Sequence, residues 1–385
     1  MIETKWAEID LDCLSHNVKE IRKRVGEKVK IAAVVKANGY GHGCLEMSSE
    51  LLSMGVDMIC VSSINEAIEI RKEHKEAEVL VLGFIPLENL AKAINFDITH
   101  TVFSYNQGLA LNDAARINDK KVKIHIKIDT GMNRTGFHPD EQSVLKIMEL
   151  SKLDKLTIQG IYSHLATADE KDKSFAFAQF DLFNKFVREL EEKGLNIPIK
   201  HISNSAAVID LPEMNLDMVR PGIILYGIYP SDEVMKSEIF LKPVMTLKAR
   251  VNFVKTLKED GGISYGLTYR GKKGQRIATI PIGYADGYTR LLSNVGEVLI
   301  GGIKSKVVGT ICMDQCMLDV SMIEGIEVGT EAILFGTNGK EEINVSEVAK
   351  RCGKIPYELL CSIGRRVPRV YLRSGKVVKE TNYLD

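Results

Sequence analysis

The stretch Ala33-Val34-Val35-Lys36-Ala37-Asn38-Gly39-Tyr40-Gly41-His42-Gly43 gives the first indication of the fold. The apolar run Ile31–Val35 predicts a buried strand that stops at Lys36 and then turns through three glycines. A strand-end lysine that is partly shielded from water can be neutral enough to form an imine with an aldehyde. The glycines let the backbone approach a ligand, and Tyr40 can hydrogen-bond an anion or stack on a ring. A lone strand-end lysine is usually a solvated surface group, so the prediction of a reactive lysine depends on the whole stretch.

Short apolar runs alternate with amphipathic stretches from about residue 30 to residue 230. The runs are Ile31–Val35, Met58–Val61, Val79–Gly83, His100–Phe103, Val122–Ile128, Ile158–Tyr162, Ile199–Ile202 and Ile223–Tyr226. The clearest helix is predicted over Ser174–Glu192, with Gly194 as its stop. Eight strand–helix units in about 200 residues are typical of a TIM (β/α)8 barrel. A doubly wound open sheet is the alternative.

The alternation of strand and helix patterns ends at about residue 240. After it, β-rich segments and turn signals such as Asp260-Gly261-Gly262 predominate. The predicted strands are Val244–Val254, Gln275–Pro281, Gly296–Ile300, Ser305–Thr310, Met317–Val320 and Thr330–Phe335. One helix is predicted over Val345–Cys352, and the junction begins at Pro230-Ser231-Asp232. We therefore expect a barrel domain at 1–235 and a mostly-β domain at 236–385, with residues 1–10 able to pack with the second domain.

Composition narrows the classes of function. The chain has 385 residues, 51 basic and 51 acidic, so its net charge of zero does not favour binding to nucleic acid or to an anionic membrane. The first residues lack the pattern of a signal peptide, and no apolar run is long enough to span a bilayer. Seven scattered cysteines favour a reduced, cytoplasmic protein. Cys312 and Cys316 lack the further ligands of a zinc site and are interpreted as mostly buried strand residues, so no metal is expected.

The candidate chemical residues follow the ends of the predicted barrel strands. Lys36 follows the first, Arg134 the fifth, His164 the sixth and Ser205 the seventh, and Arg220 and Gly222 cluster around the eighth. In TIM barrels this face carries the active site, and phosphate often binds in the loops after the seventh and eighth strands. The strand order therefore predicts one shared site.

Several longer motifs extend this pattern over nearly the whole chain. Besides the opening stretch they are Lys127-Ile128-Asp129-Thr130-Gly131-Met132-Asn133-Arg134, Ser163-His164, Asn204-Ser205-Ala206-Ala207, Val219-Arg220-Pro221-Gly222-Ile223-Ile224-Leu225-Tyr226-Gly227, Ile263-Ser264-Tyr265-Gly266, Pro281-Ile282-Gly283-Tyr284-Ala285-Asp286-Gly287 and Ile311-Cys312-Met313-Asp314-Gln315. Together and in this order, they resemble the bacterial alanine racemases. The resemblance implies an enzyme that uses pyridoxal 5′-phosphate to interconvert L-alanine and D-alanine and so supplies D-alanine for peptidoglycan.

The resemblance also assigns the cofactor-binding residues. Lys36 would hold the cofactor covalently, and Arg220 would face the nitrogen of the pyridine ring. The guanidinium can only donate, so the ring nitrogen would be unprotonated and the ring a poorer electron sink. The implied phosphate ligands are Tyr40, Ser205, the backbone amides of Gly222 and Ile223, and Tyr357.

Racemisation needs a base on each face of the substrate α-carbon. The resemblance implies Lys36 for one face and Tyr265 for the other. A phenol is a weak base near neutrality and needs help, which His164 would give by linking Tyr265 to Arg220. Related enzymes bring this tyrosine from the partner subunit, which implies a head-to-tail homodimer.

The remaining implied roles concern the substrate. Arg134, and Met313 from the partner subunit, would contact the substrate carboxylate, and Tyr284 and Tyr357 would line the access to the pocket. Lys127 corresponds to a lysine that is often carbamylated in this family, and its carbamate would position Arg134.

The sequence departs from the family pattern at three places. Asn133 replaces an expected glycine, Thr135-Gly136-Phe137 replaces a more aliphatic segment, and Thr310 replaces an arginine that commonly precedes the ICMDQ motif. Three alternatives stay open. One is a serine or broad-specificity racemase, a second is a decarboxylase of the same architecture acting on ornithine or diaminopimelate, and a third is a non-catalytic barrel that binds the cofactor.

Overall fold

The computed structural model describes residues 4–384, which divide into two units. One unit consists of Ser15–Gly39 and Cys44–Leu241. The other consists of residues 4–14, Tyr40–Gly43 and residues 242–384. Residues 1–3 of the expected N-terminal segment lie outside the described residues.

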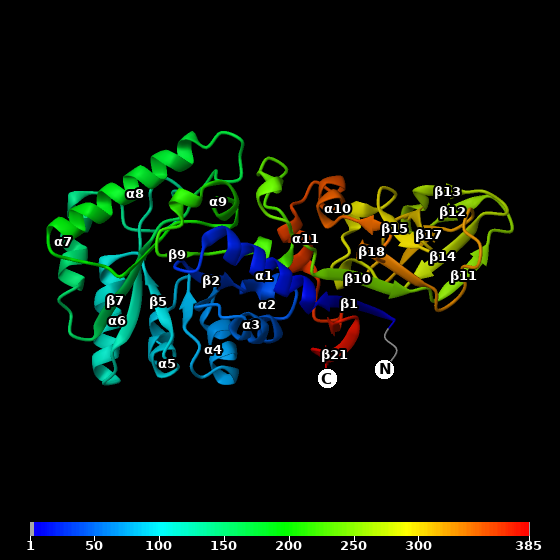
Figure 1. Cartoon of the computed structure of the whole chain (residues 1–385). Coiled ribbons are helices and arrows are strands. Elements are labelled where there is room, and N and C mark those ends of the chain that lie inside the picture. The colour runs from blue at the N-terminus through cyan, green and yellow to red at the C-terminus, as the bar shows by residue number, and fades with distance from the viewer. Residues whose placement is uncertain (1–3, 385) are drawn as a thin grey trace. The chain divides into compact units, whose positions relative to one another are not determined.

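The first unit is built on a parallel barrel (Figure 1). Among the described residues its sheet has eight strands, which follow one another around the barrel in chain order. They are β2 (Lys30–Val34), β3 (Met58–Val61), β4 (Val79–Val81), β5 (Thr99–Val102), β6 (Val122–Lys127), β7 (Leu156–Tyr162), β8 (Ile199–His201) and β9 (Met218–Val219). β9 pairs with β2, and on its other side Asp217 N donates to Lys200 O and Arg220 N to Ser203 O. The TIM-barrel prediction is therefore confirmed and the open doubly wound sheet is wrong.

Helices lie around the outside of the strands (Figure 1). They are α1 (Leu11–Val25), α3 (Cys44–Ser53), α4 (Ile64–Glu73), α5 (Leu90–Asn95), α6 (Tyr105–Ile117), α7 (Glu141–Leu150), α8 (Ser174–Glu192) and α9 (Ser205–Asp210). α8 has the predicted bounds and buries one apolar face, including Phe183, Val187 and Leu190. Its apolar face therefore packs inward as its 3.6-residue period requires.

The predicted eighth strand is wrong. Ile223–Tyr226 forms the 3-10 helix η3, and the eighth strand is β9, four residues earlier. All four residues of η3 are fully buried, and a short buried apolar run does not distinguish a strand from a helical turn by its pattern. The correction places Arg220 and Gly222 directly after the end of β9, on the same face as the other candidates.

The second unit is mostly β, as predicted (Figure 1). Its largest sheet has the order β16-β15-β18-β10-β1-β20-β21, in which β1 is antiparallel to β10 and parallel to β20. The bounds are β1 (Lys5–Asp10), β10 (Met245–Arg250), β15 (Glu297–Ile300), β16 (Ile303–Lys306), β18 (Glu331–Thr337), β19 (Glu342–Ile343), β20 (Arg369–Arg373) and β21 (Lys376–Thr381). Smaller sheets contain β11 (Phe253–Thr256), β12 (Gly261–Ile263), β13 (Tyr269–Gly271), β14 (Arg276–Ile280) and β17 (Cys316–Asp319).

Several details of the second unit differ from the sequence predictions. Val244–Val254 is two strands, and Ser305–Thr310 is extended only as far as Lys306. Of the expected turn residues, Gly261 and Gly262 belong to a strand. The predicted helix is α10 (Val345–Arg351), and a second helix, α11 (Pro356–Ser362), was not predicted. Cys316 is buried at the start of β17, as predicted, whereas Cys312 lies before that strand and is half-buried.

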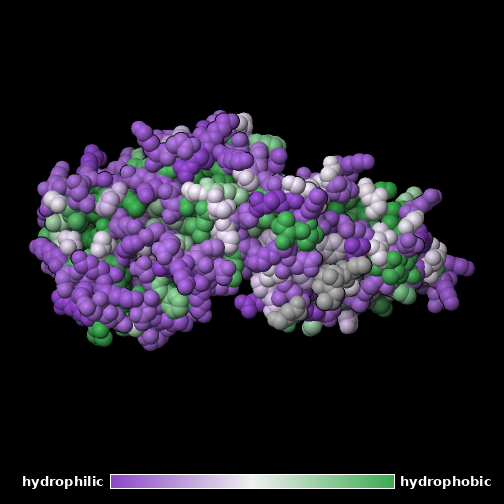
Figure 2. Space-filling view, turned by 60° about the horizontal axis from the view of Figure 1, so that its bottom comes forward, coloured by the Kyte–Doolittle hydropathy of each residue, from purple (hydrophilic) through white to green (hydrophobic). Residues whose placement is uncertain are grey.

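The surface and the thiols agree with the composition. The face shown in Figure 2 is largely hydrophilic, with small hydrophobic patches. All seven cysteines lie among the described residues, and each is a free thiol. Within residues 4–384, no helix combines the length and apolar character needed to cross a membrane.

Helix α8 offers a test of the barrel core. Phe183 is fully buried, whereas Phe177 on the same helix is 41% exposed. Phe183→Ala should lower the free energy of unfolding by about 3–5 kcal/mol, because it removes a buried ring and leaves a cavity. Urea unfolding followed by circular dichroism measures the loss. The matched variant Phe177→Ala should cost less than about 1 kcal/mol, and equal losses would contradict the assigned packing.

Candidate active site

Lys36 stands at the start of a left-handed turn. β2 ends at Val34, and the turn α2 (Lys36–Tyr40) has φ/ψ of 54°/52° at Ala37, 55°/46° at Asn38 and 61°/42° at Gly39. Left-handed backbone costs a non-glycine residue about 1–2 kcal/mol, so this turn must be held by its surroundings. The amide of Ala37 donates to Glu66 at 2.7 Å, and Asn38 Oδ1 accepts from the amide of Cys44 at 2.9 Å. The sequence predicted a glycine-rich turn but not its handedness.

Arg220 is the central cation of the barrel face. Its side chain is buried and donates through Nη1 to His201 Nδ1 at 2.7 Å. Through Nη2 it donates to Ser163 O at 2.7 Å, Ile202 O at 3.1 Å and His164 Nδ1 at 3.2 Å. Its guanidinium carbon lies 5.0 Å from the centre of the Tyr162 ring. Each of these acceptors is a neutral group, so the contacts engage donors of Nη1 and Nη2 without cancelling the charge of the guanidinium.

The contacts of Arg220 fix the tautomers of two further histidines. Arginine can only donate, so His201 Nδ1 accepts and its Nε2 carries the hydrogen. His201 Nε2 therefore donates to His125 Nδ1 at 2.8 Å, and His125 Nε2 donates to Gln159 Oε1 at 3.3 Å. Hydrogen bonds thus run in one direction from Arg220 to Gln159, with both histidines neutral.

Burial explains why these histidines stay neutral. Loss of water around His125 lowers its pKa from 6.5 to about 4. Burial, and then the charge of Arg220, lowers the pKa of His201 well below its usual value. Gly160 makes room for the chain, because a Cβ at this position would lie 2.5 Å from the His125 ring. Neither histidine was predicted as a site residue, although each is a polar residue inside a predicted buried strand, and that position is the signal that could have identified it.

His164 lies within the electrostatic influence of four cationic side chains. Its pKa is held well below the usual value, first by loss of water and then by the positive charges of Arg220, Arg134, Lys127 and Lys36. Lys36, Arg134 and Arg220 follow the ends of barrel strands, and Lys127 is the last residue of β6. The barrel face is therefore electropositive and suits an anionic ligand.

Lys127 is a buried lysine at the end of β6. Its ammonium donates to Ile128 O at 2.8 Å and lies 5.3 Å from the centre of the Tyr162 ring. Burial, and then the nearby charge of Arg220, lowers its pKa from 10.5 to about 7. A substantial fraction of the amine is thus neutral near physiological pH.

The Arg134 loop explains the asparagine in the Lys127–Arg134 motif. Asp129 accepts hydrogen bonds from the amides of Gly131, Asn133 and Arg134, at 3.0, 3.0 and 2.9 Å. Asn133 has φ of 55°, a conformation that asparagine tolerates better than most residues other than glycine. The substitution therefore preserves the loop. Arg134 itself is exposed.

Ser205 and Gly222 meet at the loops after β8 and β9. The amide of Gly222 donates to Ser205 Oγ at 2.8 Å, and both residues are buried. Asn204 caps α9 by accepting from the amides of Ala206 and Ala207. Ile223 follows Gly222 as the first residue of η3. These loops are the usual phosphate position in TIM barrels.

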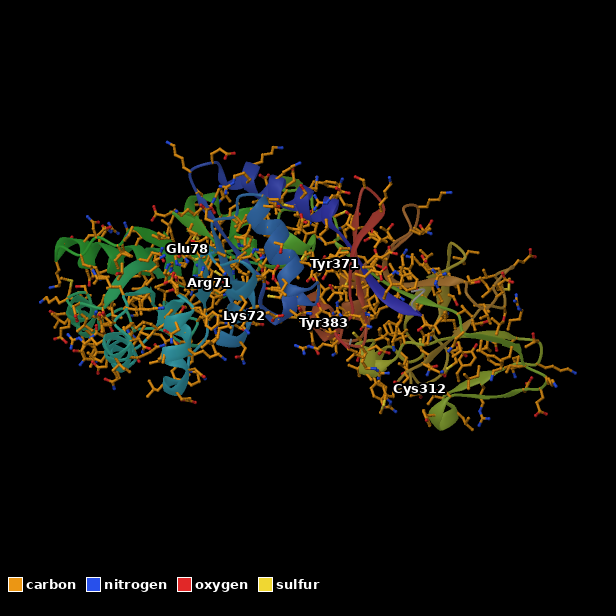
Figure 3. The ribbon with its side chains drawn as sticks, turned by 90° about the horizontal axis from the view of Figure 1, so that it is seen from below. Arg71, Lys72, Glu78, Cys312, Tyr371 and Tyr383 are labelled. Atoms are coloured by element: carbon orange, nitrogen blue, oxygen red, sulfur yellow. The ribbon has the colours of Figure 1, made fainter. Side chains whose placement is uncertain are left out.

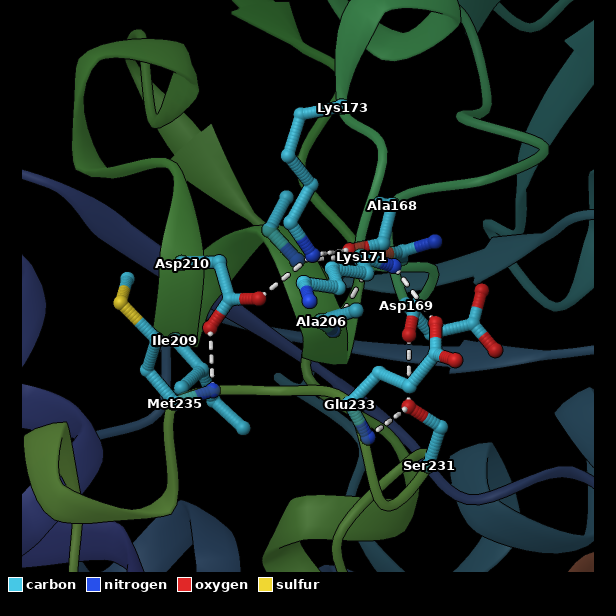
Figure 4. Close-up of polar contacts among 12 residues, drawn as sticks. Ala168, Asp169, Lys171, Lys173, Ala206, Ile209, Asp210, Ser231, Glu233 and Met235 are labelled. Carbon is cyan, nitrogen blue, oxygen red and sulfur yellow. Dashed lines mark hydrogen bonds and ion pairs between the residues drawn. The ribbon is translucent and has the colours of Figure 1, made fainter.

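A polar network holds the same loops in place (Figure 4). Lys173 Nζ lies 2.5 Å from Asp210 Oδ2 and donates to Ala168 O at 2.7 Å. Asp210 Oδ1 accepts from the amide of Met235 at 2.9 Å. Because Asp210 ends the helix that begins at Ser205, the ion pair fixes that helix to the loop that follows His164.

The second unit carries the other predicted residues. Tyr265 is 73% exposed, Met313 52% and Tyr284 43%. The amide of Tyr284 donates to Cys312 O at 3.1 Å, next to Met313. The structure of this unit therefore places Tyr284 beside the Ile311–Gln315 motif.

Tyr40 and Tyr357 lie together in the second unit, with ring centres 6.0 Å apart. The segment Tyr40–Gly43 is held by two buried side chains of β20. Arg369 Nε donates to Gly41 O at 2.9 Å, and the hydroxyl of Tyr371 (labelled in Figure 3) donates to His42 O at 2.9 Å. Neither contact was predicted, because β20 itself was missed.

The geometry defines a class of protein: a TIM-barrel enzyme with a cationic site at the carboxyl ends of its strands, joined to a mostly-β domain. Comparison with known sequences identifies the particular family. Residues 9–230 match the profile "Alanine racemase, N-terminal domain", and residues 244–371 match "Alanine racemase, C-terminal domain". The chain belongs to the alanine racemase family, which confirms the resemblance inferred from its motifs and the prediction that it is a racemase.

Individual relatives agree over nearly their whole lengths. The alanine racemase of Clostridium perfringens (strain SM101 / Type A) is 48% identical over 379 residues, 98% of each chain. The solved alanine racemase of Clostridium difficile 630 has a TM-score of 0.96 and 43% identity, with 100% of both chains covered. That of Bacillus anthracis with bound L-Ala-P has a TM-score of 0.94 and 34% identity, covering 100% of this chain and 99% of the other.

Because the buried histidines are neutral in the folded protein, we expect its free energy of unfolding to depend on pH. Since the folded pKa of His125 is below its unfolded value of 6.5, the unfolded chain takes up the proton first as pH falls. The stabilisation is complete above about pH 6.5 and is lost as pH falls toward 4, by about 3 kcal/mol for this residue. His125→Gln should therefore flatten the pH dependence of the urea midpoint in this range. The matched control is His138→Gln, because the side chain of His138 is 82% exposed, and this variant should keep the pH dependence of the wild type. If the urea midpoint changed equally with pH in the wild type and in both variants, the assignment of His125 would be refuted.

Proposed function

We propose that this enzyme interconverts L-alanine and D-alanine with pyridoxal 5′-phosphate as cofactor. The observation that carries the proposal is the buried Arg220, whose hydrogen-bond acceptors within residues 4–384 are all neutral, in a cationic barrel face. The names of the relatives support alanine as substrate, and one solved relative, 42% identical, is described as a complex with cycloserine. In the proposed physiological role, the D-alanine formed is used for peptidoglycan.

The residues of the barrel fit this cofactor. Ser205 Oγ and the amides of Gly222 and Ile223 would hold its phosphate, in the loops where TIM barrels often bind phosphate, and Tyr40 and Tyr357 would add hydroxyls. Lys36 would carry the cofactor covalently. When bound, pyridoxal phosphate withdraws electrons from the amino acid and so acidifies its α-proton.

Arg220 would face the nitrogen of the cofactor ring. Because the guanidinium only donates, and because His201 Nδ1 already accepts from it, no proton can pass along this chain to the ring. The ring nitrogen would stay unprotonated. A decarboxylase of the same architecture is expected to have an acid here, so Arg220 favours racemisation over that alternative.

Lys36 and Tyr265 would act as the two bases. His164 Nδ1 accepts from Arg220, so its Nε2 carries a hydrogen that can be donated to the oxygen of Tyr265. Such a bond would stabilise the deprotonated phenol and make it a better base. Tyr265 is 73% exposed in the single chain, which is consistent with its insertion into the site of a partner subunit in a homodimer.

The substrate carboxylate would be bound by Arg134 and by Met313 of the second unit, the latter also from the partner, and Tyr284 and Tyr357 would line the access to the pocket. A lysine must be neutral to react with carbon dioxide, and the lowered pKa of Lys127, about 7, supports its carbamylation. The negative carbamate would then position Arg134.

The free thiols favour a reducing compartment, and we propose a cytoplasmic location.

An assay of the purified enzyme with added cofactor tests the proposal. L-Alanine should lose its optical activity as D-alanine forms, and L-serine and other amino acids measured beside it will define the breadth of the substrate range. Borohydride reduction followed by peptide mapping should recover the cofactor on Lys36, and Lys36→Ala should lose both the label and the activity. Label on another lysine, or no conversion of alanine, would refute the assignment.

Complementation between two inactive variants tests the shared site. Lys36→Ala and Tyr265→Ala chains are mixed and allowed to exchange subunits. If Tyr265 acts in the site of the partner, each mixed dimer has one doubly defective site and one intact site, and activity returns to about half per dimer. If both bases come from one chain, a mixed dimer that is shown to form stays inactive.

A further inference from the structure

Tyr265 is carried by a strained turn in the second unit. Ser264 has φ of 65° and ψ of −175°, and Gly266 and Leu267 have φ of 71° and 47°. The Ser264 conformation is one that residues other than glycine rarely adopt. Because the tyrosine side chain is mostly exposed, its direction depends on the backbone of this turn. Some neighbouring group must therefore hold the turn in place.

A directed chain of hydrogen bonds ends at the carbonyl of Tyr265. Thr310 Oγ1 donates to Tyr265 O at 2.8 Å, so it can only accept from Thr268 Oγ1, 3.4 Å away. Thr268 in turn accepts from Asn294 Nδ2 at 3.0 Å, and Asn294 Oδ1 accepts from the amide of Gly309 at 2.7 Å. The hydrogen bonds thus run in one direction, from the amide of Gly309 to the carbonyl of Tyr265.

Thr310 also holds the turn through its backbone. Its carbonyl accepts from the hydroxyl of Ser264, so the same residue binds both sides of Tyr265. Gly309 allows this close approach, since a Cβ there would lie 2.6 Å from Ile263 O. Thr310 is buried, with 5% of its surface exposed. Its hydrogen bonds to the turn are therefore largely shielded from water.

We propose that Thr310 is a positioning residue for Tyr265, and that its hydroxyl sets the direction in which the phenol is presented. The inference rests on the proposed role of Tyr265 as a base. It also gives a role to one departure from the family pattern, because a threonine stands where an arginine is common. The hydroxyl of Thr310 donates one direct hydrogen bond to the carbonyl of Tyr265.

The test compares two rates in D2O, starting from D-alanine. Exchange of the α-proton with retention needs only Lys36, whereas formation of L-alanine also needs Tyr265. Thr310→Val keeps the shape of the side chain and removes the hydroxyl. It should slow inversion about fivefold while exchange persists, because a hydrogen bond of this kind contributes about 1 kcal/mol. Thr310→Ser should restore the ratio of exchange to inversion.

A second measurement does not depend on activity. With 3-fluorotyrosine in all tyrosines, the 19F signal of Tyr265, assigned by its absence in Tyr265→Phe, should shift or broaden in cofactor-free Thr310→Val. Should Thr310→Val fold poorly, Thr268→Val replaces it. Thr268 is exposed and precedes Thr310 in the chain of hydrogen bonds, so the same changes are expected with smaller size.

Control variants distinguish the proposed role of Tyr265 as a base from the proposed positioning role of Thr310. Thr330→Val is the matched control, since the hydroxyl of Thr330 accepts from the amide of Glu327, away from the turn, and should change neither measurement. If Tyr265→Phe keeps full inversion, the proposed base is wrong. If Tyr265→Phe loses inversion while Thr310→Val keeps a wild-type ratio and signal, or loses exchange and inversion in equal measure, the positioning role of Thr310 is overturned.

Discussion

The interaction on which the barrel site depends is the burial of Arg220 among acceptors that carry no charge. A buried cation without a carboxylate partner is costly by itself, and here hydrogen bonds from one guanidinium to two carbonyls and two imidazoles offset part of that cost. The remaining positive charge is what makes the strand ends attractive to an anion. It also keeps the neighbouring histidines neutral, since a second positive charge beside Arg220 would be unfavourable.

Both proposed bases lie next to residues whose backbone has positive φ. Lys36 begins a left-handed turn, and Tyr265 stands between residues with positive φ. Each turn is held by polar contacts to residues outside it, Glu66 and Cys44 in one case and Thr310 in the other. Strain of this kind persists only where surrounding structure over-determines it, and it is commonly found at functional sites. The bases thus depend on residues that take no part in proton transfer.

Much of the architecture could be predicted, because the barrel strands and α8 have strong apolar periods. The strand-end rule also predicts from the sequence that Lys36, His164 and Ser205 lie on one face. The failures have local causes. Buried residues in η3 resemble a strand, β20 begins with a buried arginine, and β21 is charged and almost wholly exposed. The roles of His125 and Thr310 depend on contacts distant in sequence, which no single-sequence pattern contains.

Gly160 has no functional group, yet the chain of neutral histidines depends on it. The His125 ring occupies the space that any side chain at this position would need. Adding one methyl group there would displace the ring, break its bond to His201 and change the acceptor that faces Arg220. If Arg220 has its proposed role, the electronic character of the proposed cofactor would then depend partly on the absence of a Cβ at position 160, and a comparison of reactive groups alone would overlook this position.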